Sequence, residues 1–492
     1  MKKPCGGRLF WRFIVAIFRI RYKIGSVINL ARKEYPMLRY LTVFLPAWLA
    51  MAGLPCAQAG EVLVLHNVNV VPMDEERVLT ERTVTIRDGM IVDIRAADEA
   101  DPPDDAEVID GSGKYLMPGL AEMHAHVPGG GQPEEYRHDV LFLYLANGVT
   151  LIRGMLGDPV HLEMREQLAG GELLGPRLIA AGPAFSGRIA PTPERGAELA
   201  RKQKEAGYDF IKVASGSREA FDAMVEAARE VGIEFSGHVP AAVGVPRALE
   251  ARYASIDHLD AYMPTLVDPE ETADIEGGFF GFRLAPYVEK ERIREMARRT
   301  REAGVWNVPT ETLMHAVLIW DLDTIRDERP EFRYMPPDIV DRWVETVRNR
   351  REDRLYDREA AEAFVQVRLD LIRALHEEGA GLLLGSDAPQ FFNVPGFSIH
   401  PEMELMERAG LSRFEVLKMG TVNPAVFFQE EDRFGRVAEG MRADLILLEA
   451  NPLEDLAHVR QVAGVIRSGK WLPREEIDRR LEAIAERHAG EE

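Results

Sequence analysis

Residues 120–126, LAEMHAH, form the stretch that decides the fold. This apolar run has the length of a buried strand, and side chains alternate between the two faces of a strand, so His124 and His126 share one face. Two imidazoles at this spacing suit two ligands of a single metal ion. Because the chain contains 12 histidines, the pair alone is weak evidence, and its meaning depends on the strands that follow.

Seven more runs of strand-like sequence follow and alternate with helical stretches. The runs are GVTLIRGM, PRLIAAG, DFIKVA, IEFSGHV, YASIDHL, VWNVPT and GLLLGSD, and the helical stretches include residues 195–207, 218–231, 289–304 and 355–379. Successive β-then-α units of this kind are typical of an α/β fold whose parallel strands close into a (β/α)8 TIM barrel. The sequence therefore predicts such a barrel over residues 116–435, with functional groups at the carboxyl ends of its strands.

The segments on either side of this barrel contain short β-rich runs separated by turns. They cover residues 60–115 and 436–473, and we expect them to pair into one small composite β-sandwich domain built from both chain ends. A charged helical tail is predicted at residues 474–492. Residues 312–352 exceed an ordinary βα connection and predict a helical insertion, which is either a lid over the barrel mouth or a surface insertion without contact to the site.

The first 59 residues differ from the rest in charge. They contain ten Lys or Arg residues and one acidic residue, Glu34, whereas the whole chain carries a formal charge of −21. Residues 37–59 combine a basic start, a short apolar stretch and the ending Ala57-Gln58-Ala59, which predicts a signal peptide cleaved before Gly60. We therefore expect a periplasmic or secreted protein without a stable membrane anchor in its mature form. Residues 1–36 then either precede the true start at Met37 or form an amphipathic surface-binding segment.

The composition argues against two classes of function. Both cysteines, Cys5 and Cys56, lie in the leader, so disulfides, thiolate metal sites and a cysteine nucleophile are excluded from the mature chain. The chain has 81 acidic and 60 basic residues, which argues against nucleic acid as a partner because that partner requires a cationic surface. We expect a small-molecule substrate, and the fold is compatible with a homo-oligomer.

Four further candidate metal ligands lie on later strands. Lys212 shares a strand face with Phe210, and a buried lysine is costly unless it is paired or neutralised. Reaction with CO₂ would convert Lys212 into a carbamate, an anionic oxygen ligand able to bridge two metal ions. His238, His258 and Asp387 each lie at the end of a strand-like run. Together with the two histidines of the first strand, these residues predict a metal site built from five strands.

Several motifs around these residues resemble the amidohydrolase superfamily, over nearly all of the mature chain. They are Met117-Pro118-Gly119-Leu120, Thr421-Val422-Asn423-Pro424-Ala425, Gly440-Met441-Arg442-Ala443-Asp444-Leu445 and Asn451-Pro452. Lys212 is similar to the carboxylated lysine of the dinuclear branch, near imidazolonepropionase-like and prolidase-like dipeptidases. The sequence departs from the family pattern at Ile152-Arg153-Gly154, where relatives commonly have an acidic residue.

The resemblance also implies how the ligands divide between two metal ions. His124, His126 and Asp387 would hold one ion, and His238 and His258 would hold the other. Carboxylated Lys212 would bridge the two ions.

This constellation predicts a metal-dependent hydrolase acting on carbon–nitrogen bonds. Two divalent ions, expected to be Zn²⁺, share a bridging hydroxide that attacks an amide or peptide-like bond, as in a dipeptide or an N-acyl amino acid. Asp387 is expected to accept the proton of the water and to deliver it to the leaving group. The alternatives are a lactone, ester or organophosphate hydrolase on the same site, a mononuclear deaminase, in which Lys212 would have no purpose, and a non-catalytic binding protein.

The residues expected to contact the substrate follow the strand ends at the barrel mouth. They are Arg153, Phe185, Tyr262, Glu311, His315 and His400. Arg153 or His400 would bind a substrate carboxylate. The alternative for each of the six is a loop salt bridge or an exposed side chain without a role in binding.

Overall fold

The computed structural model describes residues 62–99 and 102–490. The predicted leader of residues 1–59, with its signal peptide and its cleavage site before Gly60, lies outside the described residues. Within the described part of the chain, no helix combines the length and the apolar character needed to cross a membrane.

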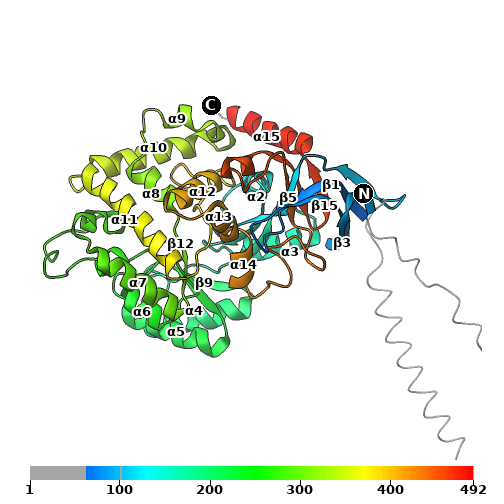
Figure 1. Cartoon of the computed structure of the whole chain (residues 1–492). Helices are drawn as coiled ribbons and strands as arrows, with labels where there is room; N and C mark the ends of the chain where they lie inside the picture. Colours follow the sequence, from blue (N-terminus) through cyan, green and yellow to red (C-terminus); the bar gives the residue numbers. More distant parts are fainter. Residues whose placement is uncertain (1–61, 100–101, 491–492) are drawn as a thin grey trace, which may run out of the picture. The chain divides into compact units, whose positions relative to one another are not determined.

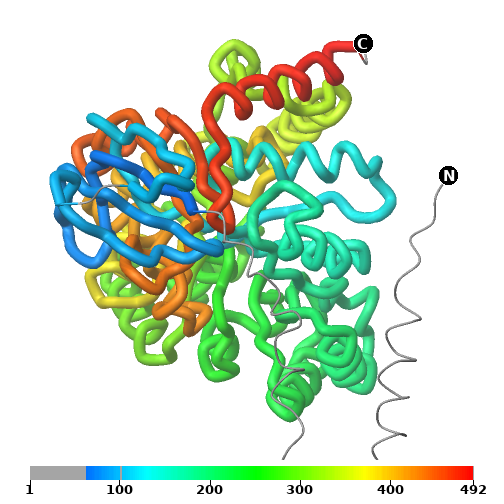
Figure 2. Tube along the Cα trace, turned by 90° about the vertical axis from the view of Figure 1, so that its right-hand side faces the viewer, coloured from blue at the N-terminus to red at the C-terminus, as the bar shows by residue number. Residues whose placement is uncertain are grey.

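One eight-stranded sheet contains strands from both parts of the sequence that flank the predicted barrel. Its strands are β1 (Val62–Val70), β2 (Leu79–Arg87), β3 (Met90–Ala96), β4 (Glu107–Asp110), β5 (Tyr115–Pro118), β13 (Leu445–Leu448), β14 (Val462–Arg467) and β15 (Lys470–Pro473). The order is β15-β14-β13-β5-β1-β2-β3, and β4 pairs with β1. The two parts meet where β5 and β13 run antiparallel, with Leu116 opposite Leu447. Figures 1 and 2 show the blue early strands beside the red end of the chain.

Parallel strands make up the central part of the α/β fold. They are β6 (Leu120–Ala125), β7 (Val149–Gly154), β8 (Arg177–Ala180), β9 (Phe210–Val213), β10 (Glu234–Gly237), β11 (Ser255–Asp257) and β12 (Trp306–Val308). They form two parallel sheets, β6-β7-β8 and β12-β11-β10-β9. Parallel bridges also join Ala181 to Phe210, Asn307 to Leu382 and Ala125 to Ala388. The segment 382–388 therefore contacts both the end of the second sheet and the beginning of the first.

Helices follow most of these strands, as expected for βα units. They are α2 (Glu134–Ala146), α3 (Val160–Gly170), α4 (Pro193–Ala206), α5 (Arg218–Val231), α6 (Gly244–Glu250), α7 (Lys290–Ala303), α11 (Arg358–Glu377), α12 (Ile399–Arg408), α13 (Arg413–Met419) and α14 (Val422–Phe427). Helix α5 shows how the sequence sets its limits. The Ser217 side chain accepts a hydrogen bond from Ala220 N at its start, and Gly232 adopts a left-handed φ of 65° at its end.

Residues 312–352 fold mainly into helices. This segment contains most of α8 (Glu311–Leu318), then α9 (Ile325–Glu328), the 3-10 helix η4 (Pro330–Tyr334) and α10 (Pro337–Glu352). Arg351 of α10 donates to the carbonyl oxygens of Ala316, Val317 and Trp320, at 2.6–3.0 Å. These bonds satisfy carbonyl groups that a helix end leaves unpaired, so α10 is tied to the end of α8.

The remaining short elements are irregular connections and the final helix. They are the 3-10 helices η1 (Ala97–Glu99), η2 (Met263–Thr265), η3 (Phe279–Tyr287) and η5 (Leu456–Arg460), and the C-terminal helix α15 (Arg474–Ala489). Helix α15 contacts both η4 and α2.

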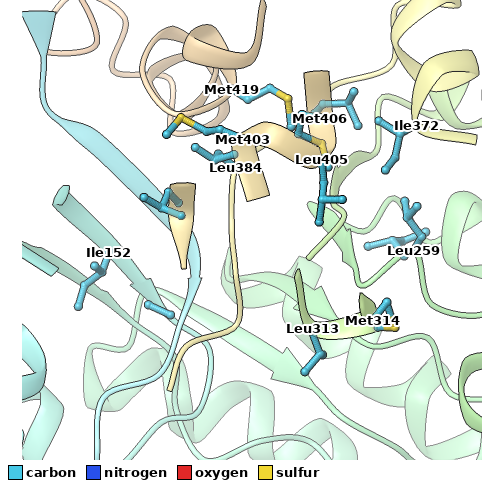
Figure 3. Packing of buried hydrophobic residues seen from close by; sticks show 14 of the residues in the cluster. Ile152, Leu259, Leu313, Met314, Ile372, Leu384, Met403, Leu405, Met406 and Met419 are labelled. Carbon is cyan, nitrogen blue, oxygen red and sulfur yellow. The ribbon is translucent and has the colours of Figure 1, made fainter. Parts of the chain in front are cut away.

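A large apolar core joins the helices to the parallel strands. Figure 3 shows methionines of α12 and α13, Met403, Met406 and Met419, packed near Leu384, which precedes Asp387 by three residues. All four side chains are at most 1% exposed. This packing fixes the backbone of the segment that ends in Asp387.

A buried carboxyl group caps the start of α8. Glu402 of α12 accepts hydrogen bonds from the backbone nitrogens of Glu311 and Thr312, at 3.0 and 2.7 Å, and from the Thr312 hydroxyl at 2.5 Å. Burial, and then the neighbouring Glu311 carboxylate, raise the pKa of Glu402 to about 7 from its usual 4.5. Helix α8 therefore begins on a group that keeps its proton to unusually high pH.

We expect this group to make the protein less stable at neutral pH and above than at acidic pH. The folded state holds the proton of Glu402 to a higher pH than the unfolded chain, so the free energy of unfolding falls as pH rises from about 4.5 to about 7, by roughly 3 kcal/mol. Urea unfolding at about pH 5 and about pH 8 measures this loss. Glutamine at position 402 cannot ionise, so the free energy of unfolding of the Glu402→Gln variant should fall by less between these two pH values. An equal fall in the free energy of unfolding of both proteins would contradict the prediction.

Candidate active site

The first pair of candidate ligands, His124 and His126, lies beside the carboxylate of Asp387 in the 382–388 segment. His126 Nε2 is 2.5 Å and His124 Nε2 is 3.3 Å from Asp387 Oδ1. One ligand atom from each of these three residues lies within 4.8 Å of the others. Two imidazoles and a carboxylate at this separation form a donor set that suits a divalent metal ion such as Zn²⁺.

Backbone hydrogen bonds between β6 and the 382–388 segment place Asp387. Met123 N donates to Leu384 O at 2.8 Å, and Asp387 N donates to His124 O at 3.0 Å. The buried carboxyl of Glu122 adds bonds from Ser386 N and its hydroxyl, at 2.7 and 2.9 Å. Burial raises the pKa of Glu122 to about 8. The side chain next to the histidine pair therefore helps to hold the candidate catalytic carboxylate.

Lys212 lies inside the same cluster. Its Nζ is 3.5 Å from His124 Nε2, and the residue is 4% exposed. No carboxylate oxygen of the described residues lies within 4.0 Å of Nζ. Burial lowers the pKa of this amine, because removal from water disfavours its charged form. The amine is therefore buried without an ion pair, although the carboxylates of Asp257 and Asp387 act from farther away to raise its pKa.

His238 and His258 complete the cluster. The two rings stack with centroids 4.6 Å apart, and the His258 ring lies 4.4 Å from that of His124. His258 Nδ1 is 2.8 Å from the Thr310 hydroxyl, and His238 Nδ1 is 3.0 Å from Asp260 Oδ2. A partner on Nδ1 orients an imidazole and leaves Nε2 for a metal ion. The structure therefore brings all six sequence-predicted ligands together.

Arg153 is 1% exposed and pairs with groups inside the protein, which contradicts its predicted contact with a substrate carboxylate. Its side chain is buried and donates to Met123 O at 2.8 Å, to Ser255 Oγ at 2.9 Å and to Asp257 Oδ1 at 3.1 Å. Asp257 Oδ2 in turn lies 2.9 Å from His124 Nδ1. The physical reason is charge: the fully buried Asp257 carboxylate needs a cation, and Arg153 supplies it.

The other five predicted substrate contacts are also buried. Phe185, Tyr262, Glu311, His315 and His400 are at most 4% exposed. The Tyr262 hydroxyl lies 2.8 Å from Thr300 Oγ1, and His315 Nδ1 lies 3.0 Å from Glu311 O. At this exposure the five side chains present almost no surface to a substrate.

Glu311 acts on the site through an arginine. Its carboxylate accepts from Arg368 Nη2 at 2.6 Å, and Arg368 Nη1 donates to the carbonyl oxygen of His258 at 2.7 Å. Arg368 also donates to Pro309 O at 2.9 Å. The buried ion pair thus holds the backbone of one candidate ligand, which is a positioning role and not contact with substrate.

The sequence reasoning missed two site residues that remain partly accessible. Asp260 follows His258 by two residues, and Phe280 lies with its ring 5.6 Å from the His258 ring and 6.0 Å from the His238 ring. Asp260 could have been recognised from the sequence as a candidate site residue, because it lies only two positions after the candidate ligand His258. The run Gly277-Gly278-Phe279-Phe280-Gly281 was another, because glycines around aromatic residues mark an unusual loop.

Comparison with known proteins places the chain in a family. The sequence profile of the amidohydrolase family matches residues 115–472. The imidazolonepropionase of Rubrobacter xylanophilus is 36% identical over 109 residues, which are 20% of this chain and 25% of that protein. The dihydroorotase of Anaeromyxobacter dehalogenans is 33% identical over 106 residues, 21% of this chain and 23% of that protein. The matched region thus spans about a quarter of each relative's length.

Solved structures resemble the whole described body. A bottromycin amidohydrolase has a TM-score of 0.67 and 26% identity, covering 86% of this chain and 90% of its own. A Xaa-Pro dipeptidase with bound methionine has a TM-score of 0.60 and 19% identity, covering 84% and 100%. A putative prolidase from Bifidobacterium longum has a TM-score of 0.61 and 23% identity, covering 88% and 100%. These likenesses indicate a fold of the TIM-barrel type. The profile matched over residues 115–472 shows that the chain belongs to the amidohydrolase family.

Proposed function

We propose that this protein is a metal-dependent hydrolase that cleaves an amide or peptide-like carbon–nitrogen bond in a small molecule such as a dipeptide or an N-acyl amino acid. The observation that carries the proposal is the position of Lys212, which is buried 3.5 Å from His124 Nε2 with no carboxylate oxygen of the described residues within 4.0 Å of its amine. Family membership supports the same conclusion, because amidohydrolases are metal-dependent enzymes.

The donor set fits two divalent metal ions, for which we propose Zn²⁺. His124, His126 and Asp387 would hold one ion, and His238 and His258 would hold the other. Lys212 would bridge them after its amine nitrogen forms a bond to the carbon of CO₂ and releases a proton, which makes the group an anionic oxygen ligand. When bound, the ions lower the pKa of a water molecule and polarise the substrate carbonyl.

Asp387 carries the proton in this proposal. Its carboxylate accepts a proton from the attacking water while the water oxygen bonds to the carbonyl carbon. It then delivers that proton to the nitrogen as the carbon–nitrogen bond breaks, so that a carboxylic acid and an amine leave. The position of Asp387 beside His126, at 2.5 Å, supports this role.

A substrate panel tests the proposal. Protein loaded with Zn²⁺ in the presence of bicarbonate is offered dipeptides, N-acyl amino acids, lactones and aryl phosphotriesters. We expect turnover of at least one amide, its loss after metal removal with a chelator, and its return on adding Zn²⁺. Turnover of only lactones or phosphotriesters would overturn the assignment of the bond, and deamination by protein with one metal ion would overturn the dinuclear site.

We also propose the larger organisation around this site. The parallel strands would close into a (β/α)8 barrel, which the bridges at Asn307–Leu382 and Ala125–Ala388 support. The small composite β-sandwich domain would be formed from both chain ends, which the pairing of β5 with β13 supports. Export to the periplasm or the medium after cleavage before Gly60 would follow from the leader sequence.

A further inference from the structure

We propose that Asp260 and Phe280 select a substrate whose reacting carbonyl belongs to a residue with a free α-ammonium group and a large apolar side chain. The inference rests on the proposed amide hydrolysis and names its substrate class: an unblocked dipeptide with a large apolar first residue. It makes Asp260 a substrate-binding residue and Phe280 a wall of the binding pocket.

The exposed atoms of the site show where a substrate can enter. The side chains of His238, His126 and Asp260 are 29%, 20% and 19% exposed, and Phe280 is also partly exposed. In contrast, His124, His258 and Asp387 are almost fully buried. We therefore place the approach of the substrate beside these partly exposed groups, which include Asp260 and Phe280.

Asp260 presents a carboxylate without a Lys or Arg ion pair among these partly exposed groups. Its Oδ2 lies 3.0 Å from His238 Nδ1 and accepts from Val239 N at 3.2 Å. Among residues 62–99 and 102–490, no Lys or Arg nitrogen lies within 4.0 Å of the carboxylate. Oδ2 therefore holds the histidine, and Oδ1 is left to accept a charge-assisted hydrogen bond from a cation.

Phe280 provides an apolar surface next to the same histidine. Its ring contacts His238 and His258, and Phe279 packs edge-on against it at 4.7 Å. Its backbone is left-handed, with φ 51° and ψ 21°, a conformation that costs a bulky residue energy and is found preferentially at functional sites. The Arg350 guanidinium of α10 lies 4.3 Å from the Phe279 ring and ties the loop to the helical insertion.

The two groups fit one residue of a substrate. In an unblocked dipeptide the α-ammonium nitrogen and the side chain are bonded to the same carbon, which is itself bonded to the reacting carbonyl carbon. Asp260 and Phe280 both contact His238, and we place one substrate residue against both of them. An N-acyl amino acid has no ammonium group and would leave the Asp260 charge unpaired, which opposes its binding.

The test compares three substrates with the Zn²⁺-loaded protein: L-leucyl-L-alanine, N-acetyl-L-leucyl-L-alanine and L-alanyl-L-alanine. We expect kcat/KM for the unblocked leucyl dipeptide to exceed that of its acetylated form by about 100-fold and that of alanyl-alanine by about 10-fold. Asp260→Asn should remove the first preference and Phe280→Ala the second. Glu271→Gln and Tyr287→Ala serve as matched controls and should change neither ratio of kcat/KM values. Both residues are exposed and, like Asp260 and Phe280, lie in the connection that follows β11.

A binding measurement keeps the test independent of turnover. Calorimetry with the Zn²⁺-loaded Asp387→Asn protein should give a dissociation constant for leucyl-alanine at least about 10-fold below that of the acetylated peptide. The metal content of Asp260→Asn is measured alongside, because Asp260 also orients His238. Equal kcat/KM and equal binding of the two peptides would overturn this inference while leaving amide hydrolysis intact. Failure of every amide in the panel would instead overturn the proposed function.

Discussion

Replacing Asp387 with asparagine should lower kcat by about 10³-fold or more and leave much of the metal bound. The amide side chain retains an oxygen that can ligate but cannot take a proton from water. Because His124, His126, Lys212 and the other two histidines remain, the metal site loses only part of one ligand. The measurement is kcat with the best amide substrate, together with metal content by atomic emission.

The Asp341→Asn variant provides the control, because Asp341 is an exposed carboxylate in α10. It should keep the activity of the parent protein. Full activity of Asp387→Asn would rule out its role as the proton carrier, and complete loss of metal from that variant would assign Asp387 to metal binding alone.

Replacing Arg153 with methionine should lower the free energy of unfolding by about 3–5 kcal/mol. The substitution removes a cation that holds Asp257, Ser255 and the backbone of Met123, and it leaves the fully buried Asp257 carboxylate without its partner. Urea unfolding at neutral pH measures the loss. The double variant Arg153→Met/Asp257→Asn should regain part of it, because the uncompensated charge is then absent.

The exposed residue Arg294 is the matched control, and Arg294→Met should change stability by less than about 0.5 kcal/mol. If Arg153→Met were as stable as the parent and instead raised KM for substrates with a carboxylate, Arg153 would have to be returned to the substrate pocket.

The candidate ligands could be predicted from the sequence because the rule behind them is local. Each histidine, Lys212 and Asp387 lies at or near the end of a strand-like run, and parallel strands bring such ends together. The sheet that joins both chain ends was predictable from the same alternation of side chains. Both predictions rest on patterns within one short stretch of sequence: a ligand beside its own strand, and the alternation of side chains along one strand.

The residues that were misplaced or missed depend on partners or backbone conformations that the local sequence does not indicate. Strand alternation shows that Arg153 points to one face, but its burial depends on Asp257, 104 residues later. The role of Glu311 depends on Arg368, 57 residues later. Phe280 reaches the histidines only through a left-handed backbone, which no propensity of phenylalanine indicates.

The most direct test of the central claim is the metal content per chain of protein beginning at Gly60 and produced with Zn²⁺ and bicarbonate, beside its Lys212→Ala variant. The dinuclear site predicts close to two equivalents of Zn²⁺ in the parent and a clear loss in the variant, since Lys212 would bridge both ions. About one equivalent in both proteins would contradict the bridged site and make deamination the next reaction to assay.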